Sequence, residues 1–260
     1  MSDEQSTDQG HGRFVWYDLM TNDAAGAEAF YTSVLPWKTA KMEIEGGAYT
    51  MWTLGGPEDS IGGIGPPPAE GVPPHWSAYV AVADVDATAA RAGELGGAVH
   101  LPPTDIPGVG RFAVLADPQG GAIAVYRSAT QPPGPLAQPK VGQFSWHELA
   151  TGDLAAATEF YFDLFGWTAL GEHDMGPMGV YRIYGQGDVP YGGIFKRPPE
   201  MPVTAWLCYV RVDDLDATVA KVTQDGGQVV NGPMDVPGGD RIAQCVDPQG
   251  AMFALHEHRS

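Results

Sequence analysis

The sequence repeats itself at an offset of 130 residues, which is half of its length of 260. The clearest matches are aromatic and run in the same order in both halves. They pair Phe14, Trp16, Phe30, Tyr31 and Trp37 with Phe144, Trp146, Phe160, Tyr161 and Trp167. Gly62-Gly63-Ile64 returns as Gly192-Gly193-Ile194, and Asp117-Pro118-Gln119-Gly120 returns as Asp247-Pro248-Gln249-Gly250. No gap is needed to align these matches, so the chain is interpreted as a duplicated domain whose local patterns occur twice.

Charge and composition exclude several function classes. Lysine and arginine number 14 against 32 acidic residues, giving a formal net charge of −18. Such a surface repels phosphate backbones and anionic lipid headgroups, so we expect no nucleic-acid or membrane partner. The sequence contains no apolar run of the roughly 20 residues that a membrane-spanning helix needs.

The chain ends and the cysteines indicate the compartment. Residues 1–12 are polar and acidic and lack the basic start and apolar centre of a signal peptide, so we expect a disordered leader. Cys208 and Cys245 are the only cysteines, and both lie in apolar, strand-like runs. Two buried thiols without a disulfide framework favour a reducing compartment, and we expect a cytoplasmic protein.

Each half divides into two similar units of secondary structure. In the first unit, a strand over 14–20 precedes a helix that Asn22 or Asp23 caps and Pro36 ends. Three strands follow at about 37–43, 48–54 and 60–65. The second unit repeats this order: a strand at 76–82, a helix capped by Asp84 or Asp86 and ending near Leu95, and strands near Ala98, at 111–116 and at 122–127. The sequence therefore predicts an α+β fold in which a βαβββ unit occurs four times.

Domain boundaries follow from the repeat. We expect a first domain at 13–128, a proline-rich linker at 129–140 and a second domain at 141–258.

The joint spacing of several motifs, present twice, resembles the vicinal oxygen chelate superfamily, which includes glyoxalases, bleomycin-type resistance proteins and extradiol dioxygenases. The first motif is Asp23 followed after six residues by Phe30-Tyr31, with Trp37 close behind. The second is the stretch 82–86 that enters the second helix, and the third is Gly110-Arg111-Phe112 running to Asp117-Pro118-x-Gly120. The resemblance implies curved mixed sheets that enclose a cavity. Function does not follow from it, because one scaffold hosts many chemistries.

The resemblance also implies where a metal ion would be held in related enzymes. Those positions lie in the first strand of each unit and in the last strand of each half, and in this sequence they carry Trp16, Ser77, Ala124, Trp146, Leu207 and Ala254. Indole, isobutyl and methyl side chains cannot coordinate a divalent cation, and one serine hydroxyl cannot do so alone. We therefore expect no metal at these positions and no cofactor.

A shifted metal site is the alternative for the cofactor. Side chains two apart on a strand share a face, so Asp18 and Glu148 should share the faces of Trp16 and Trp146. By the same rule Tyr126 and His256 should share the faces of Ala124 and Ala254. Glu148 with His256 then offers two donors for a divalent metal at a non-canonical site, without a third ligand.

The face predicted to point inward suits a flat, partly polar organic ligand. It carries Trp16, Asp18, Ser77, Tyr79 and Tyr126 in the first half, and Trp146, Glu148, Leu207, Tyr209 and His256 in the second. Aromatic rings stack on indole, while a carboxylate or phenol orients a hydroxyl or amine. Simple core packing is the alternative for the two tryptophans. Arg111 and Arg241 are the expected partners of the two carboxylates, and such pairs would be either structural or ligand-binding.

Two classes of function remain. The first is a metal-independent protein that holds a small aromatic or polyketide-like molecule for resistance, sequestration or biosynthesis. The second is a lyase, isomerase or dioxygenase-type enzyme in which Asp18, Glu148 and His256 supply acid–base or metal-binding groups. Because the duplication places two domains in one chain, we expect a monomer that mimics a dimer, or else a homodimer.

Overall fold

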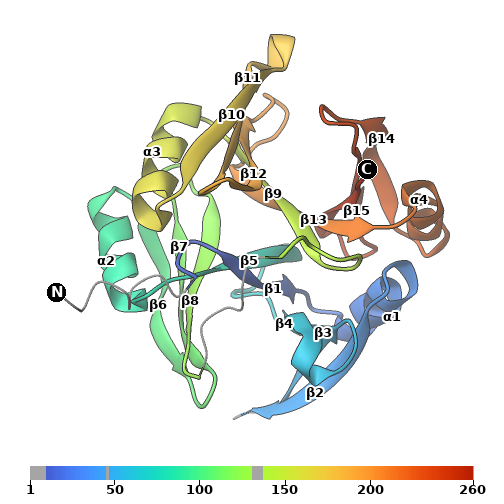
Figure 1. The fold of residues 1–260 in the computed structure, drawn as a ribbon. Coiled ribbons are helices and arrows are strands. Elements are labelled where there is room, and N and C mark those ends of the chain that lie inside the picture. The colour runs from blue at the N-terminus through green and yellow to red at the C-terminus, as the bar shows by residue number, and fades with distance from the viewer. Residues whose placement is uncertain (1–9, 45–46, 131–136, 260) are drawn as a thin grey trace. The chain divides into compact units, whose positions relative to one another are not determined.

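A computed structural model describes residues 10–44, 47–130 and 137–259 of the chain (Figure 1). Most of the expected leader and the centre of the expected linker lie outside the described residues. Residues 10–12 lie within them: Gly12 is buried, and its N–H donates to the carbonyl oxygen of Ala81 at 2.8 Å.

The elements of the first half follow the expected order twice. They are β1 (Phe14–Met20), α1 (Ala24–Val34), β2 (Lys38–Ile44), β3 (Gly47–Thr53), the short 3₁₀-helix η1 (Pro57–Asp59) and β4 (Ser60–Gly65), then β5 (His75–Ala81), α2 (Val85–Glu94), β6 (Ala98–Ile106), β7 (Gly110–Ala116) and β8 (Ala122–Ser128).

The second half repeats this order. Its elements are β9 (Phe144–Thr151), α3 (Leu154–Phe165), β10 (Thr168–Asp174), η2 (Gly176–Met178), β11 (Val180–Gln186) and β12 (Val189–Lys196), then β13 (Ala205–Val212), α4 (Leu215–Gln224), β14 (Gln228–Asp235), β15 (Arg241–Val246) and β16 (Met252–Glu257). The predicted α+β class with four βαβββ units is confirmed.

The strands form two mixed sheets of eight. Their orders are β2-β3-β4-β1-β5-β8-β7-β6 and β10-β11-β12-β9-β13-β16-β15-β14. In each four-strand block, the first strand pairs in parallel with the last strand of its own unit, as β1 does with β4 and β13 does with β16. The other neighbours within a block are antiparallel hairpin partners, as β2 is to β3.

Among the described residues, an aspartate caps the start of each α-helix. The side chains of Asp23, Asp84, Asp153 and Asp214 each accept a hydrogen bond from a backbone N–H in the first turn. This cap satisfies a donor that has no partner within the helix. It also settles the choice that the sequence left open, since Asp23 and Asp84 are the caps rather than Asn22 and Asp86. Among the described residues, no helix is long and apolar enough to cross a bilayer.

The chain divides into two compact units, and each unit takes segments from both sequence halves. Among the described residues, the first unit comprises 10–15, 78–130 and 147–206. The second comprises 16–44, 47–77, 137–146 and 207–259. Helices α2 and α3 lie side by side in the first unit, and α1 and α4 lie side by side in the second (Figure 1).

The recurring Phe-Tyr and Asp-Pro-x-Gly motifs hold each unit together. In the second unit, the hydroxyl of Tyr31 on α1 donates to Asp247 Oδ2 at 3.0 Å, and Asp247 Oδ1 accepts two backbone N–H groups of its own turn. In the first unit, the hydroxyl of Tyr161 on α3 donates to the carbonyl oxygen of Gly121 at 3.1 Å. A helix of one half is thus tied to the last hairpin of the other half, and these buried bonds each contribute on the order of 1 kcal/mol.

Candidate functional site

The residues at the family's metal-ligand positions do not fit a metal ion. Ala124 and Ala254 are 1% and 0% exposed, and their methyl groups offer no donor atom. The indole nitrogen of Trp16 has no free lone pair, because that pair belongs to the aromatic ring, and its N–H is donated to Asp18. Within the described ranges 10–44, 47–130 and 137–259, no three His, Cys, Asp or Glu side chains are grouped so that they could hold a metal ion.

Asp18 is the centre of a polar cluster in the second unit. It lies on β1 and is 8% exposed. Its Oδ1 atom accepts hydrogen bonds from Trp16 Nε1 at 2.9 Å and from the hydroxyl of Tyr49 on β3. Trp16 Nε1 also lies 3.0 Å from the Tyr49 oxygen. A buried carboxylate needs such donors, and here an indole and a phenol supply them.

Tyr49 remains a protonated donor in this cluster. Burial raises the pKa of Tyr49 well above its usual value, and the negative charge of Asp18 and the hydrogen bond to it raise the pKa further. The cluster therefore combines an acceptor, two donors and the half-buried indole face of Trp16. It can orient a hydroxyl or amine while a ring lies against the indole.

Glu148 forms the matching pair in the first unit. It lies on β9, is 9% exposed and accepts a hydrogen bond from the hydroxyl of Tyr181 on β11 at 2.8 Å. The Tyr181 ring stacks on Phe195, with centroids 5.8 Å apart. Both repeats therefore place a tyrosine on the carboxylate that follows the first-strand tryptophan by two residues.

The paired glycines explain how each tyrosine reaches its carboxylate. A Cβ built on Gly63 would lie 2.0 Å from the Tyr49 hydroxyl oxygen, and one on Gly193 would lie 2.0 Å from Tyr181 Cζ. Any side chain at these two positions would occupy the space of the tyrosine ring. The repeated Gly-Gly was the sequence signal for this arrangement, but the tyrosines themselves were missed.

The tyrosines were missed because the repeat contains a slip. Met51 pairs with Gly63, while Ile183 pairs with Gly193, so β11 runs two residues ahead of the simple offset. The expectation of a gap-free repeat is therefore wrong in this hairpin. Tyr181, and not Gly179, is the counterpart of Tyr49.

The aromatic residues expected on the second strand pairs lie in both units. In the first unit, Tyr79 is buried beside Phe112, with ring centroids 6.1 Å apart, and the Tyr126 hydroxyl donates to the carbonyl oxygen of Val109 at 2.9 Å. In the second unit, the Tyr209 oxygen accepts from Gln244 Nε2 at 2.8 Å. Ser77, Trp146 and Leu207 are half-buried.

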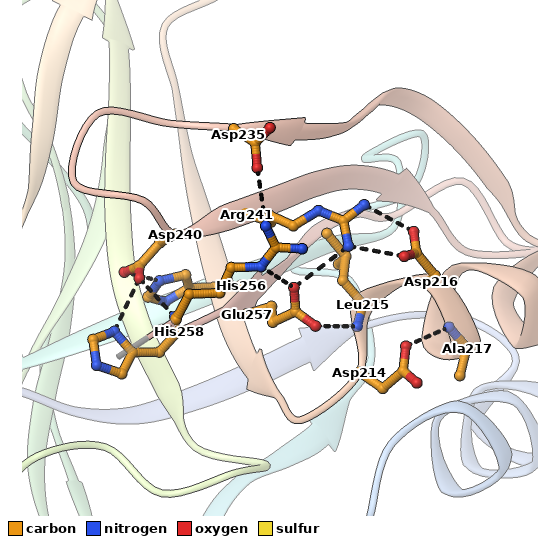
Figure 2. Close-up of polar contacts among 11 residues, drawn as sticks. Asp214, Leu215, Asp216, Ala217, Asp235, Asp240, Arg241, His256, Glu257 and His258 are labelled. Carbon is orange, nitrogen blue, oxygen red and sulfur yellow. Dashed lines mark hydrogen bonds and ion pairs between the residues drawn. The ribbon is translucent and has the colours of Figure 1, made fainter.

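His256 also lies in the second unit, on β16, with two side-chain partners. Its Nδ1 atom is 2.8 Å from Ser145 Oγ on β9, and its Nε2 atom is 2.8 Å from Asp240 Oδ2 (Figure 2 shows the second contact). Neither partner was predicted from the sequence. Ser145 and Asp240 differ from their counterparts in the first repeat, so matching residues between the repeats does not identify them.

The expected pairing of the arginines with Asp18 and Glu148 is corrected. Arg111 forms a two-pronged ion pair with Asp86, at 2.7 and 2.9 Å, and a third contact with Asp105. Arg241 forms the same pair with Asp216, at 2.8 and 2.9 Å, and also contacts Glu257 (Figure 2). Each pair joins β7 or β15 to the first turn of the helix before it. The recurrence of Asp86 as Asp216 was the signal for these structural pairs.

The sequence and the fold of this chain resemble those of known proteins. The Glyoxalase/Bleomycin resistance protein/Dioxygenase superfamily matches residues 13–125 and 142–255. CFP32 of Mycobacterium tuberculosis, a protein provisionally called a glyoxylase, is 36% identical over 251 residues that cover 92% of each chain. The anthracycline biosynthesis protein DnrV of Streptomyces peucetius is 34% identical over 268 residues, covering 95% of this chain and 94% of its own.

Solved structures share the fold at low identity. The Mn(II)-bound glyoxalase from Novosphingobium aromaticivorans aligns with a TM-score of 0.66 and 16% identity, over 95% of this chain and 82% of its own. The 2,3-dioxygenase LapB from Pseudomonas sp. KL28 aligns with a TM-score of 0.65 and 13% identity, over 96% and 93%. At such identities the likeness concerns the fold alone.

Proposed function

Because the chain belongs to the Glyoxalase/Bleomycin resistance protein/Dioxygenase superfamily, we propose that it binds a small aromatic molecule on this scaffold without a metal ion. The observation that carries the proposal is the Asp18 cluster with Trp16 and Tyr49. It places a half-buried indole, a buried carboxylate and a phenol within hydrogen-bonding distance of one another. This combination stacks on a ring and orients a polar substituent.

The ligand class follows from the chemistry of the cluster and from the relatives. An acidic acceptor beside an indole favours a hydroxyl-bearing or amine-bearing ring system. DnrV, and DauV of Streptomyces sp. strain C5, are named for anthracycline biosynthesis. We therefore propose a planar, polyketide-like compound with a hydroxyl or amino group. Its fate is sequestration, resistance or assistance to a biosynthetic step.

Metal independence is part of the proposal. Glu148 and His256, the two donors of the alternative site, belong to different compact units, and each has a protein partner: Tyr181 for Glu148, and Ser145 with Asp240 for His256. Elemental analysis of the full chain, purified without chelator, should find no stoichiometric zinc, nickel, iron or manganese. A stoichiometric metal that Glu148→Ala removes would replace this proposal with the enzymatic alternative.

Titration calorimetry and tryptophan quenching test the binding. The full chain, treated with EDTA, is titrated with an anthracycline and with an aliphatic compound of similar mass. We expect saturable binding of the anthracycline alone, with the same affinity before and after chelation. Asp18→Asn and Trp16→Leu should each weaken binding about 10-fold, the loss of about 1.4 kcal/mol expected for one good contact.

A matched control separates the site from general charge. Asp59→Asn removes another carboxylate of the second unit, one that lies in the exposed η1 helix, and should leave the affinity unchanged. The proposal fails if no planar compound binds, or if chelation abolishes binding.

A further inference from the structure

The second unit contains an unbroken serine–histidine–aspartate chain of hydrogen bonds. Ser145 Oγ on β9 lies 2.8 Å from His256 Nδ1, and His256 Nε2 lies 2.8 Å from Asp240 Oδ2. Asp240 directly precedes β15, the antiparallel neighbour of the strand that carries His256. The last hairpin of the chain and β9, from which it is distant in sequence, thus bring a hydroxyl, an imidazole and a carboxylate together.

The carboxylate determines which way the hydrogen bonds run. An ionised Asp240 only accepts, so His256 must carry its proton on Nε2. In the neutral imidazole, Nδ1 is then a bare lone pair that faces Ser145. The serine hydroxyl therefore donates to the imidazole at 2.8 Å, in preference to the carbonyl oxygen of Tyr209 at 3.4 Å. This is the arrangement of a nucleophile bonded to its general base.

Asp240 is held in place as an anion by further donors. Its Oδ1 atom accepts from His258 Nδ1 and from the backbone N–H of Arg259, each at 3.0 Å (Figure 2 shows the histidine contact). Burial would raise the pKa of Asp240, but the hydrogen bonds from Arg259, His256 and His258 outweigh it and leave the pKa below its usual value. The carboxylate is thus ionised at neutral pH and fixes the imidazole tautomer.

The first unit provides an internal comparison. The positions equivalent to Ser145, Asp240 and His256 carry Val15, Gly110 and Tyr126. The Tyr126 ring covers Gly110, since a Cβ built on that glycine would lie 2.6 Å from it, and the tyrosine hydroxyl bonds to a backbone carbonyl. The serine, the histidine and the aspartate are therefore all present in the second repeat, and all three are replaced in the first. Simple packing requires none of the three polar groups, because the first repeat packs without them.

We propose that Ser145, His256 and Asp240 form a nucleophilic site for acyl transfer, with a small carboxylic ester as substrate. Ser145 Oγ bonds to the acyl carbon while its proton moves to His256 Nδ1. The ester C–O bond breaks, and the leaving alkoxide takes that proton. Water then gives a proton to His256 Nδ1 and attacks the acyl carbon. The bond between that carbon and Ser145 Oγ breaks, Oγ takes the proton back, and the carboxylic acid leaves. Asp240 is a positioning residue, because it acts through the imidazole.

All three side chains are partly exposed to solvent. Ser145 is half-buried, and the side chains of His256 and Asp240 are 16% and 24% exposed. The proposed site does not depend on the Asp18 cluster, so the ligand-binding function can fail without affecting it.

A fluorophosphonate probe tests the nucleophile in the full chain. Intact mass should show one added phosphonyl group, and peptide mapping should place it on Ser145. Ser145→Ala should abolish labelling. Ser60→Ala is the matched control and should label like the parent chain. Ser60 donates to the carbonyl oxygen of Pro57 and has no imidazole partner among the residues that the structure describes. Labelling that persists in Ser145→Ala, or none in the parent chain, overturns the proposal.

The positioning role of Asp240 has its own readout. Asp240→Asn should slow labelling by roughly 10-fold or more, because the amide no longer fixes the imidazole tautomer, and Asp240→Glu should recover part of the rate. Near-UV circular dichroism identifies a variant that has lost its fold. If a variant has lost its fold, Ser145→Cys provides a second test of the site. The thiol of Ser145→Cys should react with iodoacetamide faster than the thiol of Ser60→Cys. Equal rates for the two cysteines, or for Asp240→Asn and the parent chain, contradict the mechanism.

Discussion

The two compact units are built to one plan, and one difference between them lies where a phenylalanine of one half of the sequence stacks on a ring of the other half. In the second unit, Phe144 stacks on Tyr17 with centroids 3.7 Å apart. In the first unit, Phe14 stacks at the same 3.7 Å on His147, the counterpart of Tyr17. Geometry is retained while chemistry changes, because one unit places a titratable imidazole where the other has a phenol. Duplication has therefore preserved the packing and left the units free to diverge in charge and reactivity.

Separating the halves should have the largest effect on both units. Residues 1–130 expressed alone lack Asp247 and Phe144, which Tyr31 and Tyr17 contact in the second unit. They also lack α3, whose Asp163 forms a two-pronged ion pair with Arg91 of α2 in the first unit. We expect no cooperative unfolding of this fragment as a monomer, and recovery of the native circular dichroism on mixing with residues 131–260. A fragment that melts cooperatively as a monomer would contradict the composition of the units.

Acid should destabilise the first unit through His147. Burial lowers the pKa of His147 to about 4, because the charged imidazole is poorly solvated in the core. The unfolded chain binds the proton below about pH 6.5, so stability is present above that pH and is lost as the pH falls toward 4. The total loss is about 3 kcal/mol, and urea unfolding at several pH values measures it.

Two variants sharpen this test of the first unit. His147→Phe should flatten the dependence between pH 6.5 and 4, because the titrating group is gone. Tyr17→Phe, at the equivalent position of the second unit, should leave the slope unchanged. An unchanged slope in His147→Phe would mean that another group controls the acid response.

Filling the glycine beside each site tyrosine should have an intermediate effect. Gly63→Ala and Gly193→Ala force Tyr49 and Tyr181 away from their carboxylates, at a cost of about 1–3 kcal/mol for an overpacked position. We expect the larger loss for Gly63→Ala, because Tyr49 contacts both Asp18 and Trp16. Denaturant midpoints of the two variants measure the difference. Gly171→Ala is the control, because a Cβ built there meets no atom within 4 Å and the glycine has no positive φ.

The two arginine pairs should show the smallest difference. Arg241→Ala should lower the melting temperature more than Arg111→Ala does, because the Arg241 side chain is 16% exposed against 33% for Arg111. Its second partner, Glu257, is also 14% exposed, whereas Asp105, the second partner of Arg111, is 75% exposed. Both effects should shrink at high salt. Equal decreases at low salt would show that the greater burial of the Arg241 pairs adds nothing.

The sequence predicted the fold because the repeat and the capping aspartates report local structure. Strand parity also placed Trp16 and Asp18 on one face, where the structure joins them by a hydrogen bond. Partners across the sheet were harder to predict. Tyr49 and Tyr181 were missed because two additional residues in one hairpin shift the repeat, and Asp86 and Asp216 were not matched to the arginines because their proximity depends on helix packing.

Ser145 and Asp240 were missed for a different reason. A search for matching residues selects what the halves have in common, which is the packing. Val15 against Ser145, and Gly110 against Asp240, are differences between the halves, and they gain meaning only when the structure places them beside His256.

Each unit contains segments from both halves of the sequence, and this determines the order in which the two units can fold during synthesis on the ribosome. When the first half has emerged from the ribosome, neither unit has all of its segments, so neither unit can complete its fold. The first unit is complete once Trp206 has left the exit tunnel, whereas the second requires the segment that begins at Leu207 and carries Asp247 near the end of the chain. Tyr31 is among the earliest core residues translated and among the last to find its partner, and the first unit is therefore expected to fold ahead of the second in the cell.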